Sequence, residues 1–181
     1  VDFFNQIDTI HAEFTQINKG VSSSSIIQGS GEIFLEKPNK LVWEMYEPFR
    51  KKMVINGSTM IFYDEDLNQA LISDYIEDNK SSWINLFMKR KYNNDANLIK
   101  EQRLIDDQYF VTFMIDDFRD EYKSVIFIFE DERLNKIKLE NVSSQITEIE
   151  FTTFEINTTI TKTLFNYSVP PSADVIDQRR E

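Results

Sequence analysis

Residues 29–69, GSGEIFLEKPNKLVWEMYEPFRKKMVINGSTMIFYDEDLNQ, contain strand-like segments separated by short turn signals. Within them Leu41, Trp43 and Met45 recur with a period of two, which indicates strands that turn one face toward a core. Pro38 and Pro48 interrupt the pattern, because proline has no amide hydrogen to donate to a sheet. Asn56-Gly57 predicts a tight hairpin turn. This stretch therefore predicts an antiparallel meander without a crossover helix.

The residues before the meander predict a helix over residues 2–17. Apolar side chains recur there at alternating steps of four and three, which would form one stripe on an amphipathic helix. The residues of this stripe are Phe3, Ile7, Ile10, Phe14 and Ile17. Gly20 follows, and glycine is the usual residue just past the end of a helix.

After strands over about 30–73, a second amphipathic helix is expected at about residues 80–91. Trp83, Leu86 and Phe87 would form its apolar face, and basic residues lie at its end, as the helix dipole prefers. Strand patterns return over about 97–169. They end in a strand over 164–169, and the polar tail 170–181 follows.

Between residues 145 and 156 the apolar residues change register, which predicts a β-bulge near Thr152-Thr153. Meander strands with a few amphipathic helices indicate the α+β class, in which a curved antiparallel sheet is covered by helices. With 181 residues, the chain (1–181) is expected to form a single domain.

The composition limits the possible partners. A formal charge of −11 argues against nucleic acid and against stable binding to an anionic membrane. No apolar run approaches the ~20 residues of a membrane span. The chain has no cysteine and therefore no disulfide. It begins at Val1 without an export signal, so we expect a mature form from which such a signal has been removed.

The high number of phenylalanines, 15 among 181 residues, can be interpreted in two ways. They could fill an ordinary core, or they could line an apolar cavity for a hydrophobic ligand.

Catalytic chemistry is poorly supported. His11 is the only histidine, and we expect it on the exposed side of the first helix. Without cysteine, one histidine cannot form the familiar nucleophilic dyads. No glycine-rich phosphate loop, GxSxG or HExxH motif occurs. The sequence leaves open the possibility that folding brings two carboxylates together as an acid–base pair. The acidic residues that are neighbours in the sequence, however, fall at predicted turns, where carboxylates are ordinarily solvated. We expect no enzyme activity, cofactor or metal.

Several sequence blocks together resemble the outer-membrane lipoprotein carrier family (LolA type). They follow one another in the family's order and spacing over nearly the whole chain, while residues 75–140 match only in pattern. The blocks are HAEFTQ (11–16), GSGE (29–32), KPNKLVWE (37–44), NGST (56–59), FYD (62–64), QITEI (145–149), FNYSVPP (165–171) and DVIDQ (174–178).

The resemblance implies an open, unclosed antiparallel β-barrel whose concave apolar face is covered by a lid of helices. It also implies a monomeric carrier that moves triacylated lipoproteins through the periplasm. Such a carrier receives them from an inner-membrane ABC transporter and gives them to an outer-membrane acceptor lipoprotein.

The resemblance implies that the strands supply the cavity residues and that the two helices supply the lid residues. For each residue taken alone, ordinary packing in the core is as good an explanation of its apolar side chain as contact with a ligand. The expected cavity residues are Ile33, Leu35, Leu41, Trp43, Met45, Met53, Ile55, Phe62 and Phe151. The expected lid residues are Ile10, Phe14, Trp83, Leu86 and Phe87. Lys37 stands where the family has an arginine that latches the lid. Lysine lacks the planar fork of arginine and should latch less specifically.

Two other functions are compatible with the same fold. One is the outer-membrane acceptor, which is anchored through an N-terminal cysteine. The other is a regulatory module that senses lipid or lipoprotein.

Overall fold

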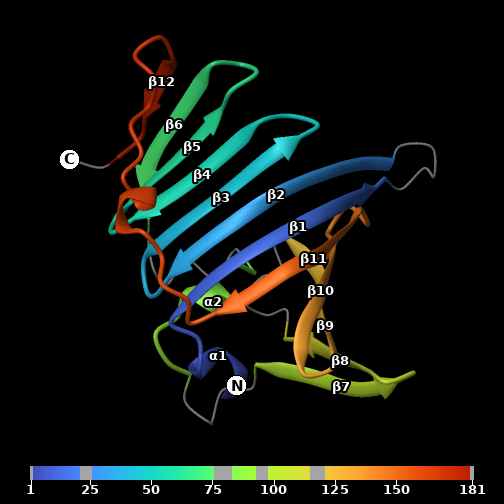
Figure 1. Cartoon of the computed structure of the whole chain (residues 1–181). Helices are drawn as coiled ribbons and strands as arrows, with labels where there is room; N and C mark the ends of the chain where they lie inside the picture. The colour runs from blue at the N-terminus through green and yellow to red at the C-terminus, as the bar shows by residue number, and fades with distance from the viewer. Residues whose placement is uncertain (1, 21–25, 76–82, 93–97, 115–120, 180–181) are drawn as a thin grey trace.

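A single curved sheet accounts for most of the structure, a computed structural model that describes residues 2–20, 26–75, 83–92, 98–114 and 121–179. The strand order is β12-β6-β5-β4-β3-β2-β1-β11-β10-β9-β8-β7. Neighbouring strands are antiparallel, except that β12 runs parallel to β6. The end strands β12 and β7 lie at opposite edges, so the sheet is open (Figure 1).

The strands of the N-terminal half are β1 (Thr9–Lys19), β2 (Ile26–Glu36), β3 (Lys40–Glu47), β4 (Lys51–Asn56), β5 (Thr59–Asp64) and β6 (Gln69–Asp74). Those of the C-terminal half are β7 (Ile99–Ile105), β8 (Gln108–Phe113), β9 (Tyr122–Glu130), β10 (Arg133–Asn141), β11 (Ile146–Ile156) and β12 (Asp174–Asp177). The helical segments are α1 (Asp2–Asn5), α2 (Asn85–Met88) and the 3-10 turn η1 (Lys162–Phe165).

The predicted meander is confirmed. β2 to β6 pair in sequence order, and the chain turns where the prolines interrupt the strand pattern. Asn56 pairs with Thr59, so the tight turn consists of Gly57 and Ser58. Gly57 has a φ of 66°, the left-handed conformation that glycine adopts without steric cost.

The predicted helix over residues 2–17 is wrong. Only Asp2–Asn5 is helical, and Thr9–Lys19 forms β1, which pairs with both β2 and β11. Ile10, Ala12 and Phe14 are buried and alternate with more exposed residues. The even spacing of these residues suits a strand, and β1 gains two neighbouring strands, whereas an isolated helix would gain none.

Two further elements differ from expectation. The helix expected at about 80–91 has only four helical residues among those described, Asn85–Met88, and its expected first residues 80–82 lie outside the described chain. The strand expected over 164–169 is absent. η1 occupies its beginning, and the last strand is β12, within the expected tail.

The predicted bulge is confirmed. Glu13 pairs with Thr153 and Phe14 pairs with Phe151, so Thr152 has no partner on β1. The extra residue restores Phe151 and Phe154 to one face of β11, because a bulge reverses the alternation of side chains.

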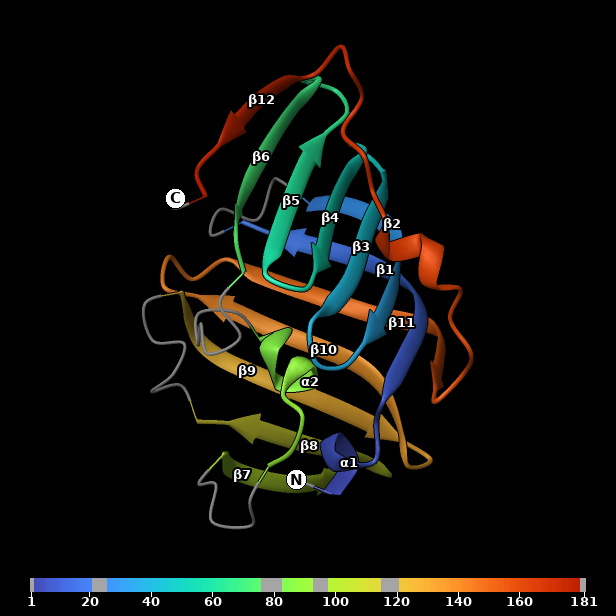
Figure 2. The same cartoon turned by 90° about the vertical axis from the view of Figure 1, so that its left-hand side faces the viewer.

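The main core lies on the concave side of the curved sheet, beneath α1 and α2 (Figure 2). A smaller cluster lies on the convex side, where the segment around η1 covers β3 and β4. It consists of Val42, Val54, Ile160 and Phe165.

Candidate functional site

Three rows of apolar side chains cross the concave face, because directly opposed residues of neighbouring strands share one face of a sheet. The first row runs from β1 to β5 through Ile10, Leu35, Leu41, Ile55 and Met60. The second contains Ala12, Ile33, Trp43, Met53 and Phe62. The third contains Phe151, Phe14, Gly31 and Met45.

All nine residues expected to line a cavity lie in these rows, although they differ in exposure. Four of them are fully packed in the core: Ile33, Leu35, Leu41 and Ile55. Four others are more exposed and line an open cavity: Trp43, Met45, Met53 and Phe62. Phe151 packs against Phe154, with ring centroids 4.9 Å apart. Their role in ligand binding stays a prediction.

The segment around α2 lies across this face and contacts it through aromatic rings. Trp83 meets Trp43 edge to face, with ring centroids 5.5 Å apart. Phe87 stacks on Phe127 of β9 at 5.5 Å and meets Phe4 of α1 at 5.3 Å. We call residues 83–92 the cover. The expected apolar face of Trp83, Leu86 and Phe87 is buried against the sheet.

Two cavities flank the contact between Trp43 and Trp83, and both tryptophans line each of them. The cavity on the side of β4 and β5 has a volume of about 250 Å³ and is otherwise lined by Met45, Lys51, Met53, Phe62 and Ile84. The other has a volume of about 450 Å³ and is otherwise lined by Gln16, Glu121, Tyr122, Leu139, Asn141, Val142, Thr147 and Ile149. Of these two, only the larger cavity falls within the range of about 300–1,000 Å³ that is typical of small-ligand sites.

Most residues that line the larger cavity were not among those predicted from the sequence to form the site. Gln16 comes from β1, Leu139 from β10, and Thr147 and Ile149 from β11. A period of two over residues 10–16 places Gln16 on the same face as Phe14, so reading these residues as a strand would have found it. Partial burial raises the pKa of the Glu121 carboxyl at this cavity.

Lys37 holds the short helix α1 rather than α2. Its ammonium group donates a hydrogen bond to the backbone oxygen of Phe4 at 2.5 Å. Burial lowers the pKa of Lys37, while the nearby carboxylate of Asp8 opposes this shift. The charged group is retained at this partly buried position because it donates to a carbonyl at the helix end, which also accepts a hydrogen bond from the backbone nitrogen of Ile7 at 3.3 Å.

A pair of hydrogen bonds joins α1 to the cover. The side chain of Asn5 donates to the backbone oxygen of Tyr92 at 3.0 Å and accepts from the backbone nitrogen of Tyr92 at 2.7 Å. The hydroxyl of Tyr92 donates to the backbone oxygen of Leu86 at 3.0 Å. Polar contacts therefore connect Lys37, α1 and the cover in series.

Ile10 and Phe14 do not belong to a helical lid. They are buried on β1 and are part of the concave face itself. Phe14 packs against Trp43, with ring centroids 4.9 Å apart. Both residues therefore lie on the side of the site opposite to the cover.

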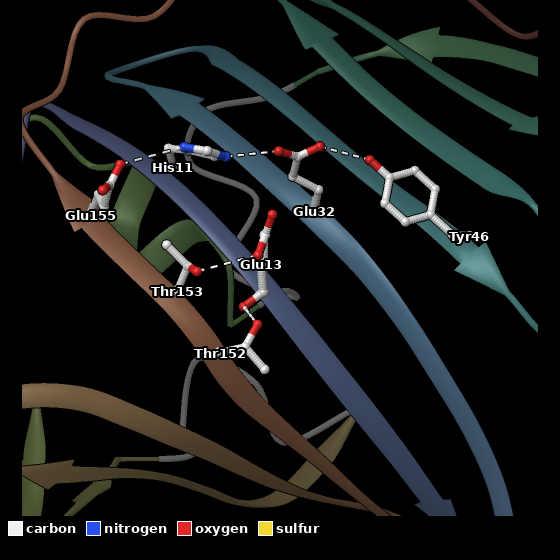
Figure 3. A network of polar contacts seen from close by, with 7 residues as sticks. All are labelled: His11, Glu13, Glu32, Tyr46, Thr152, Thr153 and Glu155. Carbon is white, nitrogen blue, oxygen red and sulfur yellow. Dashed lines mark hydrogen bonds and ion pairs between the residues drawn. The ribbon is translucent and has the colours of Figure 1, made fainter.

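A polar network crosses the opposite, convex face (Figure 3). His11 is not on an exposed helix surface. Its Nε2 lies 2.7 Å from a carboxylate oxygen of Glu32, and its ring stacks on Phe34 at 4.6 Å. Tyr46 donates to the other oxygen of Glu32 at 2.7 Å. Burial and this hydrogen bond raise the pKa of Tyr46. The network ties β1, β2 and β3 together on the face away from both cavities.

The residues that the structure describes contain no group of three or more His, Cys, Asp or Glu side chains placed to hold a metal ion. None of their helices is long and apolar enough to cross a membrane.

An open sheet with an apolar concave face, two cavities and a short aromatic cover defines a class of single-sheet proteins whose concave side is partly covered by a short helical segment. The chain belongs to the family of the outer membrane lipoprotein carrier protein LolA, which it matches over residues 5–168.

Individual proteins agree with this assignment. An outer-membrane lipoprotein carrier protein from Methylococcus capsulatus is 24% identical over 177 residues, covering 98% of this chain and 85% of the relative. Another from Francisella philomiragia is 28% identical over 187 residues, covering 99% of this chain and 89% of the relative. The crystal structure of a conserved protein from Thermus thermophilus shares the fold, with a TM-score of 0.59, 10% identity and coverage of 96% and 93%.

Proposed function

We propose that this protein is a non-catalytic periplasmic carrier that binds the acyl chains of lipoproteins between the concave face and the cover. The position of Trp43 and Trp83 between two cavities, of which the one beside β4 and β5 is mainly apolar, is the main structural support. The carrier would receive lipoproteins from an inner-membrane ABC transporter and pass them to an outer-membrane acceptor lipoprotein. It would act after removal of an export signal.

The physical basis is the cost of exposing acyl chains to water. Burial of each methylene group contributes about 0.8 kcal/mol, so free chains would not cross an aqueous compartment unaided. The rings of Trp83 and Phe87 already occupy part of the concave face. Cover and acyl chains would therefore compete for the same apolar surface, which permits release as well as binding.

The contacts of Lys37 and Asn5 would set how readily this cover leaves the sheet. The polar contacts of the cover include the hydrogen bonds of Asn5 to Tyr92 and of Tyr75 to Asn85, while Lys37 bonds to Phe4 of α1. Lysine donates as a point charge without the fixed fork of arginine. We therefore propose that Lys37 acts as a latch through α1.

The test is co-expression with a triacylated lipoprotein, followed by native mass spectrometry of the purified protein. We expect a one-to-one complex that disappears when an outer-membrane acceptor is added. Trp43→Ala should reduce the bound fraction about tenfold, because it removes a wall of both cavities. Lys52→Gln, next to Met53 but on the convex side, should leave it unchanged. Recovery of only empty protein or free lipid would contradict the carrier function.

A further inference from the structure

A third cavity lies apart from the two beside the tryptophans. Its volume is about 410 Å³, and none of its residues lines the other two. It lies between α1 and strands β7 to β9. Its apolar wall consists of Phe3, Phe4, Ile99, Val111, Phe113 and Phe129. This space is therefore apolar inside.

Three carboxylates line the cavity from two neighbouring turns. Asp107 belongs to the turn between β7 and β8, and Asp131 and Glu132 form the turn between β9 and β10. The pairing of Gln108 with Glu130 brings these turns side by side. All three carboxylates are exposed. The mouth of the cavity is therefore acidic.

These carboxylates lack the partners that other acids of the sheet have. Glu148 pairs with Lys19 at 2.8 Å, for example. Within the described residues, Asp107, Asp131 and Glu132 make no ion pair. The adjacent Arg133 makes none either, and Arg103 of β7 is paired with Glu101 at 2.6 Å. The negative charge at this mouth is left uncompensated.

The turns also hold these acids in an unusual conformation. Asp106 and Asp107 have φ values of 47° and 63°, and Asp131 and Glu132 have values of 48° and 63°. Glycine or asparagine fits such turns more easily than glutamate does. Aspartate tolerates this conformation, but Glu132 accepts some backbone strain and still presents a carboxylate here.

Apolar surface continues from the cavity to the edge of the sheet. Tyr109 lines the cavity and is 41% exposed, and its cross-strand partner Leu104 is 69% exposed. β7 is the end strand of the sheet. A ligand that covers all of this surface must extend over the hairpin as well as enter the cavity. A segment of polypeptide is long enough to cover both the hairpin and the cavity, whereas a small molecule that fills the cavity is not.

We infer that this surface binds a segment of a partner protein in which a bulky apolar side chain is flanked by lysine or arginine. The apolar side chain would enter the cavity against Phe113 and Phe129. The cations would face Asp107, Asp131 and Glu132, which have no competing partner. This docking surface shares no lining residue with the two cavities beside the tryptophans.

The probe is a fluorescent peptide with the sequence Lys-Lys-Phe-Leu-Lys-Lys, blocked at both ends, whose binding is measured by anisotropy and mapped by amide NMR shifts. We expect the shifts at β7 to β9 and at both acidic turns. Replacing Phe-Leu by Ser-Ser should weaken binding at least tenfold, because the cavity is then left empty.

The protein variant D107N/D131N/E132Q should also weaken the peptide about tenfold, because it removes three charges at nearly constant shape. Asparagine tolerates the left-handed conformation as well as aspartate does, so the turns should be retained. Asp66→Asn, in the turn between β5 and β6, is the matched control and should have no effect.

Three outcomes would overturn the inference. The serine peptide could bind as tightly as the apolar one, which would indicate charge attraction alone. The charge variant could bind the peptide unchanged. Dodecylamine could shift the same resonances while the peptide does not, which would assign the cavity to a small cationic amphiphile. None of these readouts involves lipoprotein binding, so failure here would leave the proposed carrier function intact.

Discussion

Gly31 shows how closely the strands and rings of the concave face approach one another. A Cβ atom at this position would lie 2.1 Å from the backbone oxygen of Glu44 and 2.6 Å from the ring of Phe14. Both distances are too short for a real Cβ contact, so neighbouring atoms would have to move. The nearer of them is a backbone oxygen, which cannot move by a simple side-chain rotation. The absence of a side chain at Gly31 therefore lets Phe14 reach Trp43.

We expect Gly31→Ala to lower the free energy of unfolding by about 2 kcal/mol or more, because overpacking displaces β3 or Phe14. Urea unfolding followed by circular dichroism measures this change. Ser30→Ala, the adjacent change on the other face of β2, is the control and should stay within about 0.5 kcal/mol of the unmodified protein. Equal stability of Gly31→Ala and the control would contradict the described packing.

Asp64 makes stability depend on pH. It is 7% exposed, lies 3.0 Å from the Lys51 ammonium and accepts a hydrogen bond from the Leu67 backbone at 3.1 Å. The hydrogen bond from Lys51 is the main reason why its pKa lies below the ordinary value of 3.8, and burial opposes the shift. The folded state therefore binds this proton less tightly than the unfolded state. Its contribution to stability is present above pH 3.8 and is lost as the pH falls through the folded pKa.

Asp64→Asn should accordingly lower the free energy of unfolding at pH 7 by about 1–2 kcal/mol. The difference from the unmodified protein should shrink as the pH falls below about 3.8. Urea unfolding at a series of pH values tests this, with Asp66→Asn of the same turn as control. A difference that is constant down to the lowest pH would show that the Asp64 charge contributes nothing.

The alternation within β2 to β5 was sufficient to predict which of their residues share the concave face, but not which of them stay accessible. Leu41 and Trp43 have the same alternation, yet Leu41 is completely buried and Trp43 borders two cavities. That difference depends on where the cover lies. No pattern within β3 records the position of residues that are forty positions away in the chain.

Among the elements, β1 shows why a periodic pattern can mislead. Steps of four are even, so Ile10 and Phe14 fall on one face of a strand as well as on one side of a helix. Ile17, at an odd step from Phe14, fits only the helix. In the structure it pairs with Glu148 on β11 and is only half-buried. Pairing with β2 and β11 outweighs the local preference for a helix. β11 lies more than a hundred residues away in the chain, so its contribution cannot be read from the local pattern.

The terminal strand β12 is an accessory element. All four of its residues are exposed, and it contacts the sheet only through its parallel pairing with β6. A chain that ends after Ser172 should keep the sheet, lose about 1–2 kcal/mol of unfolding free energy and expose the edge of β6. We expect self-association that increases with concentration, measured by size-exclusion chromatography together with urea unfolding.

The matched control is a chain that ends after Gln178, which retains β12 and its pairing with β6. It should remain monomeric and as stable as the full chain. Loss of the sheet signal in circular dichroism for the shorter chain would mean that β12 is required for folding.

The whole molecule combines a continuous, hydrogen-bonded sheet with a cover that is not part of the sheet. Twelve strands form one sheet, whereas the cover packs on its concave face through buried side chains and is joined to α1 by the hydrogen bonds of Asn5. Ligand binding should therefore displace the cover and leave the sheet nearly unchanged, because local opening follows the weakest contacts.

The only two tryptophans of the chain report on this opening. Trp43 belongs to β3 and Trp83 to the cover, and their ring centroids lie 5.5 Å apart at an angle of 78°. Indoles this close couple electronically and should give an exciton couplet in the far-ultraviolet circular dichroism spectrum. A synthetic triacylated cysteine peptide should abolish most of the couplet, because acyl chains that enter between sheet and cover must part the rings. The same peptide without acyl chains is the control, and Trp43→Phe or Trp83→Phe should remove the couplet from the free protein. If the lipopeptide binds and the couplet persists, the acyl chains do not separate Trp43 from Trp83, and the cover is not displaced by the ligand.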